Sequence, residues 1–391
     1  MRIPLSAPDI SEEDIQAVCK VLRSPRLSLG PKLEEFESHI ASYVGASDAI
    51  AVNSGTSGLH LCVRALGLGE GDEVIVPSFA FIAVANAVRY EKATPVFVDI
   101  EPETLNLDSR RIEAAVTSRT KAIIVVHTFG CPAKLEAILE IAARHNLQVI
   151  EDACEAIGAR CNGQMVGALG DAGVFSFYPN KQVTTGEGGV VVTRNRQISQ
   201  FVRKARNQGR DDPASWFQHS ELGYNYRISD INCALGLEQM KRIEPILARR
   251  EAIARQYSQM LARHSEFTLP LLTVPFGRIS WFVYVIRLGM QFTQVHRDCV
   301  VRGMQLRGIG VGRYFAPIHL QPLYNRWAGP EPLQVTERVA SRTIALPFFN
   351  RIHNDQIDEV CSTLIELTNA AGCMDESDIK QQGLQPRFAI G

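Results

Sequence analysis

The sequence predicts an α/β protein with a large domain built on a mostly parallel sheet, followed by a smaller α+β domain. Two observations predict this fold class. Between residues 49 and about 195, short apolar runs alternate with helical patterns, an order typical of parallel strands joined by crossover helices. After about residue 265 the elements become shorter and the alternation ends. A chain of 391 residues is long enough for two such domains.

The expected elements follow from apolar runs and helical periodicity. The expected strands of the large domain cover residues 49–53, 73–77, 95–100, 122–128, 148–152, 173–177 and 189–193. The expected helices between them cover 56–66, 80–90, 108–116 and 134–145. A long helical region follows at 229–263, where Pro245 should kink or break the helix.

In the second part, residues 279–287 favour a strand and residues 295–307 a helix, whereas residues 371–391 show no periodicity. We therefore expect a large domain with an N-terminal arm over residues 1–245 and a small C-terminal domain over residues 246–370. Residues 371–391 are expected to form a flexible tail.

The composition limits the possible partners. With 41 basic and 42 acidic residues the formal net charge is −1, which gives no reason to expect nucleic acid or an anionic membrane as a partner. No apolar run approaches the roughly 18 residues of a membrane helix, and the N-terminus turns polar too soon for a signal peptide. Nine scattered cysteines without a Cys-x-x-Cys pair point to a reducing cytoplasm and not to a zinc site.

Lys181 lies between the expected strand 173–177 and a glycine-rich turn that leads into the strand 189–193. Such a lysine is close to the backbone and away from bulk water. It is therefore placed to form a Schiff base, in which the neutral amine is the nucleophile.

Asp152 ends the expected strand 148–152 after two apolar residues. One interpretation is a helix N-cap. The other is a carboxylate that pairs with a protonated pyridine nitrogen, which would also remove the cost of burying the charge.

The turn Ser54–Gly58 follows the first strand and opens a helix, so its N–H groups and hydroxyls could hold a phosphate. It could equally be an ordinary helix cap. Ser176 offers another hydroxyl at the same sheet edge, unless it is a buried strand serine bonded to backbone. Lysine, carboxylate and phosphate cradle together suggest pyridoxal 5'-phosphate (PLP).

Further candidates lie in polar or aromatic segments. Phe81 follows a strand and could stack on a flat ring, or be a core aromatic. Asn225 and Arg227 lie in a loop before a helix and could contact a phosphate or carboxylate, or only solvent. His319 stands in a proline-bounded apolar segment, where a lone histidine is more often structural. No cluster has metal-ligand spacing.

Taken together, these motifs closely resemble those of the DegT-type (DegT/DnrJ/StrS) sugar aminotransferases, which are PLP enzymes of the aspartate-aminotransferase-like fold type I. The resemblance covers roughly residues 1–365 and rests on motifs in family order, namely Asn53–Thr56, Pro77–Phe81, Glu151–Gly158, Ser176–Gly189, Gly223–Arg227 and Pro317–Pro322. It implies a seven-stranded sheet in the large domain.

The resemblance also implies residue roles. Lys181 would hold PLP covalently and later move the proton between substrate carbon and cofactor, while Asp152 would pair with the pyridinium nitrogen. Phe81 would stack on the ring. The cofactor phosphate would be bound by Gly55, Thr56, Ser57 and Ser176. Asn225 would reach the same phosphate from the neighbouring subunit, so that the protein would be a homodimer with shared sites. Arg227 and His319 would contact the substrate.

Glu155 stands where many family members have glutamine near the phenolic oxygen of the cofactor. Perosamine-synthase-like members, which act on a 4-keto-6-deoxy sugar nucleotide, tend to have an acid there. The resemblance therefore implies amino transfer from L-glutamate to a nucleotide-diphospho 4-keto-6-deoxyhexose, in cytoplasmic polysaccharide or lipopolysaccharide biosynthesis. The alternatives are a 3-keto sugar, a cyclitol ketone, glutamine as the donor, or a non-catalytic regulatory protein.

Overall fold

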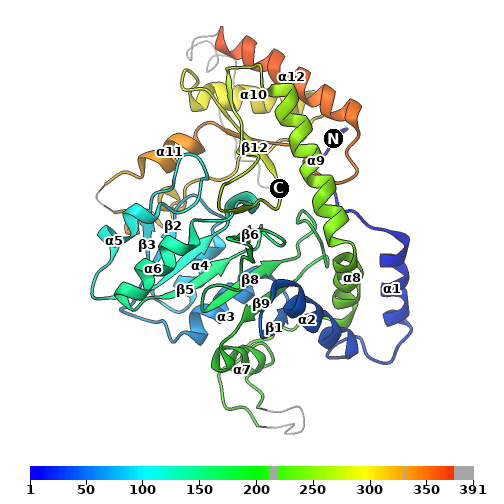
Figure 1. Ribbon diagram of the computed structural model, residues 1–391, viewed down its shortest axis with the longest axis vertical. Coiled ribbons are helices and arrows are strands. Elements are labelled where there is room, and N and C mark those ends of the chain that lie inside the picture. The colour runs from blue at the N-terminus through cyan, green and yellow to red at the C-terminus, as the bar shows by residue number, and fades with distance from the viewer. Residues whose placement is uncertain (212–217, 330, 374–391) are drawn as a thin grey trace.

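A seven-stranded sheet forms the centre of the larger part of the protein, in the order β1-β9-β8-β5-β4-β2-β3 (Figure 1). The computed structural model describes residues 1–211, 218–329 and 331–373. The strands are β1 (Asp48–Val52), β2 (Glu73–Pro77), β3 (Thr94–Val98), β4 (Thr120–Val126), β5 (Gln148–Asp152), β8 (Ala172–Ser176) and β9 (Gly189–Thr193). β9 runs antiparallel to β1 and β8, and the other strand pairs of this sheet are parallel. The predicted mostly parallel sheet is confirmed.

Helices cover both faces of this sheet. α3 (Gly55–Ala65), α4 (Ala83–Tyr90) and α7 (Arg196–Ala205) share the core on one face, and α2 (Pro31–Val44), α6 (Leu135–His145) and α8 (Asp230–Lys241) the core on the other. Strand side chains alternate between the two cores, as a pleated strand requires. On β4, Ile123 and Val125 belong to the core that contains α6, and Ile124 and Val126 belong to the core that contains α3. The strands are therefore apolar on both faces.

The helical region expected at 229–263 is two helices, α8 and α9 (Ile243–Leu261), which meet at Arg242. Pro245 lies in the first turn of α9, where its missing N–H costs no helical hydrogen bond. The predicted break is therefore confirmed. Figure 1 shows α9 running from the large sheet to the helices at the top of the view.

The smaller part contains an antiparallel sheet of β10 (Phe267–Thr268), β12 (Tyr284–Leu288) and β13 (Thr343–Leu346). α10 (Gln294–Leu306), α12 (Asn354–Gly372) and the second half of α9 share its core, and the predicted α+β character is confirmed. Ile246 and Leu247 belong to the core of the large part, whereas Tyr257 and Leu261 belong to that of the small part. The domain boundary at residues 245 and 246 stays a prediction.

Some predicted bounds shift by up to three residues, and three predicted elements need correction. The helix expected at 108–116 is only a 3-10 turn, η1 (Ser109–Arg111), and one α-helical turn, α5 (Ile112–Ala115). The strand expected at 279–287 begins only at Tyr284. The tail expected from residue 371 begins inside α12, and residues 374–391 lie outside the described part of the chain.

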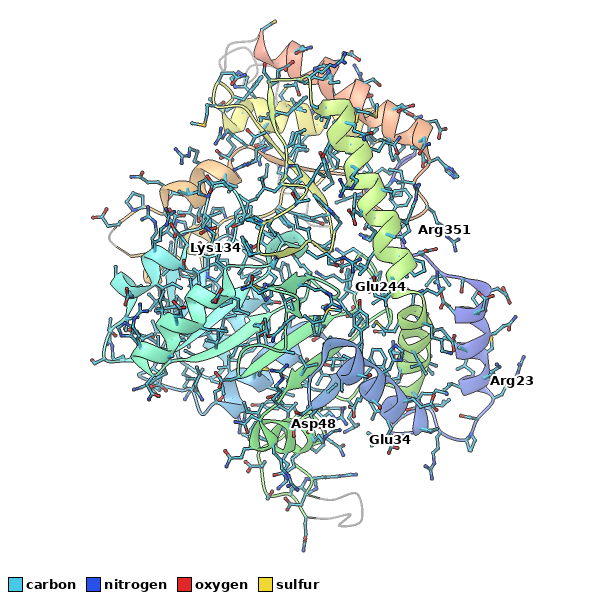
Figure 2. All side chains as sticks on the ribbon, viewed as in Figure 1. Arg23, Glu34, Asp48, Lys134, Glu244 and Arg351 are labelled. Carbon is cyan, nitrogen blue, oxygen red and sulfur yellow. The ribbon has the colours of Figure 1, made fainter. Side chains whose placement is uncertain are left out.

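The remaining elements connect or cover these parts. They are α1 (Glu12–Leu22), the hairpin β6 (Arg160–Cys161) and β7 (Gln164–Met165), β11 (Gly277–Arg278), α11 (Gln334–Ala340), and the 3-10 turns η2 (Thr128–Gly130), η3 (Ile318–Leu320) and η4 (Asn325–Trp327). Charged side chains such as Arg23, Glu34 and Arg351 project from the surface (Figure 2). Within the described ranges, no helix has the length and apolar character needed to cross a membrane.

Candidate active site

A cavity of about 300 Å³ opens at the carboxyl ends of the parallel strands. Parallel sheets of this kind bind ligands at that edge. The cavity collects residues from the ends of several strands and from the first turn of α3. The predicted site residues that line it are Gly55, Thr56, Phe81, Asp152, Glu155, Ser176 and Lys181.

Lys181 reaches this cavity from the turn after β8. Its backbone N–H donates to the carbonyl of Tyr178 at 2.9 Å, which closes the turn. The side chain is 12% exposed, and its Nζ atom lies 3.7 Å from Oε1 of Glu155. The same Nζ atom lies 4.0 Å from the centre of the Phe282 ring. The amine is therefore held inside the cavity and does not point into solvent.

Asp152 faces the cavity because it alternates with Glu151 along β5. The Glu151 carboxylate faces the other side, where it accepts hydrogen bonds from His127 and from the N–H groups of Gly167, Leu169 and Gly170. Asp152 is only 7% exposed, and Oδ1 accepts the N–H of Cys154 at 3.1 Å. The thiol of Cys154 is a second donor to Asp152. Because Asp152 lines the cavity and Glu151 does not, Asp152 is the carboxylate that can accept a hydrogen bond from a cationic group bound there.

The first turn of α3 forms another wall. Ser54 caps the helix by accepting the N–H of Ser57 at 3.1 Å, and the N–H groups at a helix start have no partner within the helix. A Cβ atom on Gly55 would lie 2.8 Å from Sγ of Cys154 and 3.0 Å from Cβ of Ser176. Glycine therefore lets the helix start approach the strand ends, where N–H groups and the hydroxyls of Thr56 and Ser176 can hold an anion.

Glu155 and Cys154 are ionisable groups at the base of the cavity. Burial raises the pKa of the Glu155 carboxyl, although Lys181 and the N–H of Phe129, at 2.9 Å from Oε2, act in the opposite direction. Burial, and next the charge of Asp152, raise the pKa of the Cys154 thiol. The Cys154 thiol therefore stays protonated and is a weak nucleophile.

Ser57 and His319 do not line the cavity. The hydroxyl of Ser57 donates to Oδ1 of Asn53 at 2.6 Å inside the helix cap. His319 is buried, with Nδ1 2.6 Å from the hydroxyl of Ser78 and Nε2 3.2 Å from Glu337. Both side chains already have hydrogen-bond partners within the chain. For His319, this agrees with the alternative that the histidine has a structural role.

Asn225 and Arg227 also lie away from the cavity lining. Asn225 is exposed, and its carbonyl accepts a hydrogen bond from the side chain of Asn53 at 3.4 Å. Arg227 donates to the side chain of Asn207 at 3.0 Å. A single chain therefore does not bring these two residues to Lys181.

An aromatic wall of the cavity was missed by the sequence analysis. It consists of Phe282, Tyr314 and Phe315 from the smaller part of the protein. Phe282 lies in the segment that was expected to be a strand. Tyr314 and Phe315 lie a few residues before His319, and their aromatic character was the available signal.

The residues present fit PLP. The carboxylate of Asp152 lines the cavity and can accept a hydrogen bond from a ring N–H, a helix start with two hydroxyls can hold a phosphate, and the amine of Lys181 lies in the same cavity. No group of three His, Cys, Asp or Glu among the described residues could hold a metal ion. The fold and these residues are compatible with a PLP enzyme of fold type I.

The chain belongs to the DegT/DnrJ/EryC1/StrS aminotransferase family, whose sequence profile matches residues 8–365. It is 40% identical over 365 residues to GDP-perosamine synthase of Caulobacter vibrioides. This match covers 93% of this chain and 97% of the relative. The predicted family and the prediction of an aminotransferase are confirmed.

Solved structures agree with this fold. PseC of Helicobacter pylori, an aminotransferase of pseudoaminic acid biosynthesis, superposes with a TM-score of 0.90 at 27% identity over 95% of this chain and 100% of that chain. A putative sugar aminotransferase of Streptococcus pneumoniae, solved in its PLP form, has a TM-score of 0.89 at 25% identity, also over 95% and 100%.

Proposed function

We propose that the protein is a PLP-dependent aminotransferase that moves the amino group of L-glutamate to C4 of a nucleotide-diphospho 4-keto-6-deoxyhexose. The observation that carries the proposal is the position of Lys181, whose amine lies inside a cavity lined by Asp152 and by the first turn of α3. The family and a relative named for the synthesis of an amino sugar nucleotide support the sugar substrate. The acid at Glu155 supports C4.

The cofactor would supply a cationic ring that accepts the electron pair left on a substrate carbon after it loses a proton. The chain would supply the other functions. Lys181 would bind the cofactor covalently and, once released, would take a proton from the donor carbon and return it to another carbon. Asp152 would keep the ring nitrogen protonated, and Phe81 would cover one ring face.

The anion at the other end of the cofactor would be held by the helix start at Gly55 and by the hydroxyls of Thr56 and Ser176. We further propose that the site is shared in a homodimer, with Asn225 reaching the phosphate of the partner. The exposure of Asn225 in this chain supports that role. Ser57, Arg227 and His319 do not line the cavity of their own chain. They would contact the phosphate or the substrate only if their side chains moved, or if they reached the site of the partner subunit.

The test is a spectrum followed by a product analysis. Purified protein loaded with PLP should show a visible absorbance band that L-glutamate bleaches, and a 4-keto-6-deoxy sugar nucleotide should restore the band. NMR of the product locates the new amine at C4 or C3. Lys181→Ala should abolish turnover, whereas the matched surface variant Lys92→Ala should not, because Lys92 is exposed. Turnover by Lys181→Ala would contradict the proposal.

A further inference from the structure

A short segment of the smaller part, residues 280–282, lies directly against the large part. The N–H of Ser280 donates to the carbonyl of Gly130 at 2.9 Å, and the N–H of Phe282 donates to that of Phe129 at 3.4 Å. A Cβ atom on Gly130 would lie only 1.7 Å from the carbonyl oxygen of Ser280. The two backbones are therefore in contact, which explains why β12 begins only after this segment.

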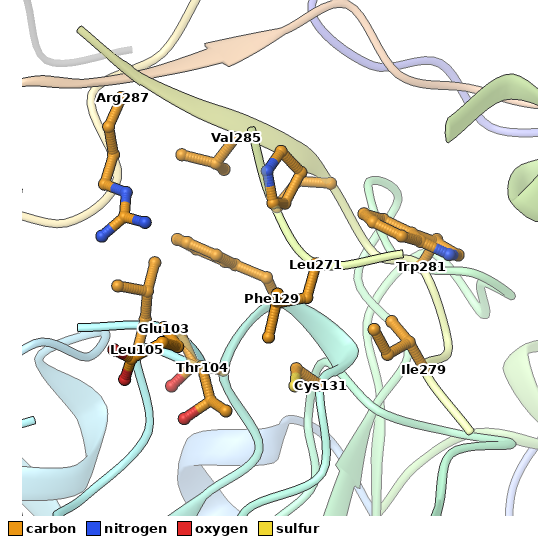
Figure 3. A pocket seen from close by; sticks show the side chains of 13 residues that line it. Glu103, Thr104, Leu105, Phe129, Cys131, Leu271, Ile279, Trp281, Val285 and Arg287 are labelled. Carbon is orange, nitrogen blue, oxygen red and sulfur yellow. The ribbon is translucent and has the colours of Figure 1, made fainter. Parts of the chain in front are cut away.

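Figure 3 shows the same junction at a small cavity of about 40 Å³, which Phe129 lines together with Leu271, Trp281 and Val285 of the smaller part. The ring of Phe129 also stacks on that of Phe315, with their centres 5.3 Å apart, and Phe315 lines the large cavity. The junction is thus packed on both sides of Phe129.

The residue after the lysine is tied to this segment. The Nε2 atom of Gln182 donates to the carbonyl and the hydroxyl of Ser280, both at 3.1 Å, and to the carbonyl of Glu155 at 2.7 Å. Gln182 is 3% exposed. The segment therefore sits in a fixed place relative to the backbone of Lys181.

A buried arginine holds the segment from the side of α9. The Nε atom of Arg250 donates to the carbonyl of Trp281 and its terminal nitrogen to the carbonyl of Phe282, both at 2.7 Å. Burial lowers the pKa of Arg250 to about 10, so the guanidinium stays charged at neutral pH. Two charge-assisted hydrogen bonds to adjacent carbonyls fix the segment in orientation as well as in position.

The result of these contacts is the placement of the Phe282 ring. It is buried, it lines the cavity, and the Nζ atom of Lys181 lies 4.0 Å from its centre. We propose that Phe282 is a positioning residue for Lys181, whose face holds the amine whenever the amine is not bonded to the cofactor, and that Arg250 fixes this ring from the smaller part. The inference rests on the proposed function, because only a lysine that is released during the reaction needs such a rest position.

The aromatic face suits this task because an ammonium group is attracted to it. Glu155 is the other partner of the amine, but burial favours its neutral carboxyl. The ring does not titrate and is therefore the more constant partner. The rate of proton transfer depends on the position of the base. Without the contact to the Phe282 ring, the Lys181 amine should therefore transfer its proton more slowly.

The first experiment measures how fast Lys181 of the cofactor-free protein reacts with trinitrobenzenesulfonate, by peptide mapping. The exposed Lys92 in the same sample is the internal standard. In Phe282→Leu, and in Phe282→Met as a second ring-free variant, Lys181 should react roughly 3- to 10-fold faster, because the contact that holds the amine is lost. In Phe282→Tyr, which keeps the ring face, the rate should stay within about twofold of the original protein.

Two further variants separate positioning from mere opening of the cavity. Tyr178→Leu removes another lining aromatic, which makes no cation–π contact with Lys181 in the described chain, and should leave the labelling rate of Lys181 unchanged. Arg250→Lys keeps the charge but loses the forked donor set, and should raise the rate. Equal rates in Phe282→Leu and Phe282→Tyr, or an equal increase in Tyr178→Leu, would overturn the inference.

The second experiment uses the PLP-loaded enzyme and α-deuterated L-glutamate. The deuterium isotope effect on bleaching of the visible band should be larger in Phe282→Leu than in Phe282→Tyr, because proton transfer becomes the slow step. An original protein without a visible band, or with a band that glutamate does not bleach, would contradict the proposed function. A normal band with the same isotope effect in all variants would contradict only the inference.

Discussion

Asp152 and Glu151 are adjacent acids with opposite environments, and this difference decides which of them can serve a cofactor. Glu151 accepts hydrogen bonds from one side chain and three backbone N–H groups, whereas Asp152 has only the backbone N–H and the thiol of Cys154 as donors and lines the cavity. The alternation of a strand separates two residues that look alike in the sequence.

Asp152→Asn should therefore leave the fold and the binding of PLP intact but slow the reaction with L-glutamate by about 100-fold or more, because a neutral amide cannot keep the ring nitrogen cationic. Stopped-flow bleaching of the visible band measures this rate. The matched control is Asp48→Asn, an acid at the start of β1 paired with Arg203 at the surface, which should have little effect. Equal rates in the two variants would remove Asp152 from its assigned role.

At the residue scale, sequence reasoning identified the groups whose position follows from local structure. Lys181, Asp152 and Glu155 stand at or just after strand ends, so the period of the strands places them at one edge. Phe282 could not be predicted in this way, because its place depends on contacts with Phe129 and Arg250, far away in the sequence.

At the scale of elements, the loop 167–170 is held to β5 by a single buried carboxylate. Glu151 is fully buried, and His127 donates to it through Nε2, because Nδ1 already accepts the N–H of Ala133. Burial raises the pKa of Glu151, but the hydrogen bonds from His127, Gly167 and Gly170 outweigh it, and the net pKa is lowered. The carboxylate therefore stabilises the folded state in its ionised form.

Glu151→Gln should lower the free energy of unfolding by about 2–4 kcal/mol at pH 7, because an amide cannot accept from all four donors. A lowered folded pKa gives stability that is present above the unfolded value, about 4.5, and is lost as the pH falls through the folded value. The difference between the two proteins should thus shrink below about pH 4.5. Urea unfolding at several pH values measures it.

The control for this experiment is Glu113→Gln, which removes a half-exposed acid paired with Arg144 and His145. Exposed ion pairs contribute little to stability, so this variant should unfold like the original protein at pH 7. A Glu151→Gln protein with the original stability at pH 7, or a difference that grows in acid, would show that the loop does not depend on the ionised carboxylate.

The elements themselves were mostly predictable, for physical reasons. The strands of the parallel sheet are apolar on both faces and bounded by turns, so β2, β5 and β9 were placed with their observed bounds. The segment 279–283 was wrongly predicted to be part of a strand, because its apolar and aromatic residues are typical of strands. Its N–H groups at Ser280 and Phe282 instead pair with the large part of the protein, a long-range contact that no local pattern contains.

At the scale of the whole molecule, one helix belongs to both cores. The first turns of α9 pack with the large sheet and its later turns with the small sheet, and Arg250, between them, contacts the segment that reaches the cavity. A movement of the smaller part would therefore change the position of Phe282. Sequence patterns indicated the two parts but not this coupling, because it depends on the packing of α9 against both.

The loop around Asn225 gives the largest-scale prediction, which concerns a second copy of the chain. Tyr224 and Tyr226 stack on each other, 4.8 Å apart, and bond to Arg64 and His60 of α3. The alternation of the chain then turns Asn225, between them, outward. An exposed, rigidly presented amide that does not line its own cavity is suited to complete the site of a partner.

If the sites are shared in a homodimer, two inactive variants should restore each other. Lys181→Ala lacks the amine, and Asn225→Ala should bind PLP weakly because the phosphate loses the contact from Asn225 of the partner subunit. In a mixed dimer, one site combines Lys181 of one chain with Asn225 of the partner subunit and is intact. Random exchange makes half of the dimers mixed, so about a quarter of the original activity should return. Activity assays after co-refolding measure this recovery, and no activity above the sum of the separate variants would show that each chain builds its site alone.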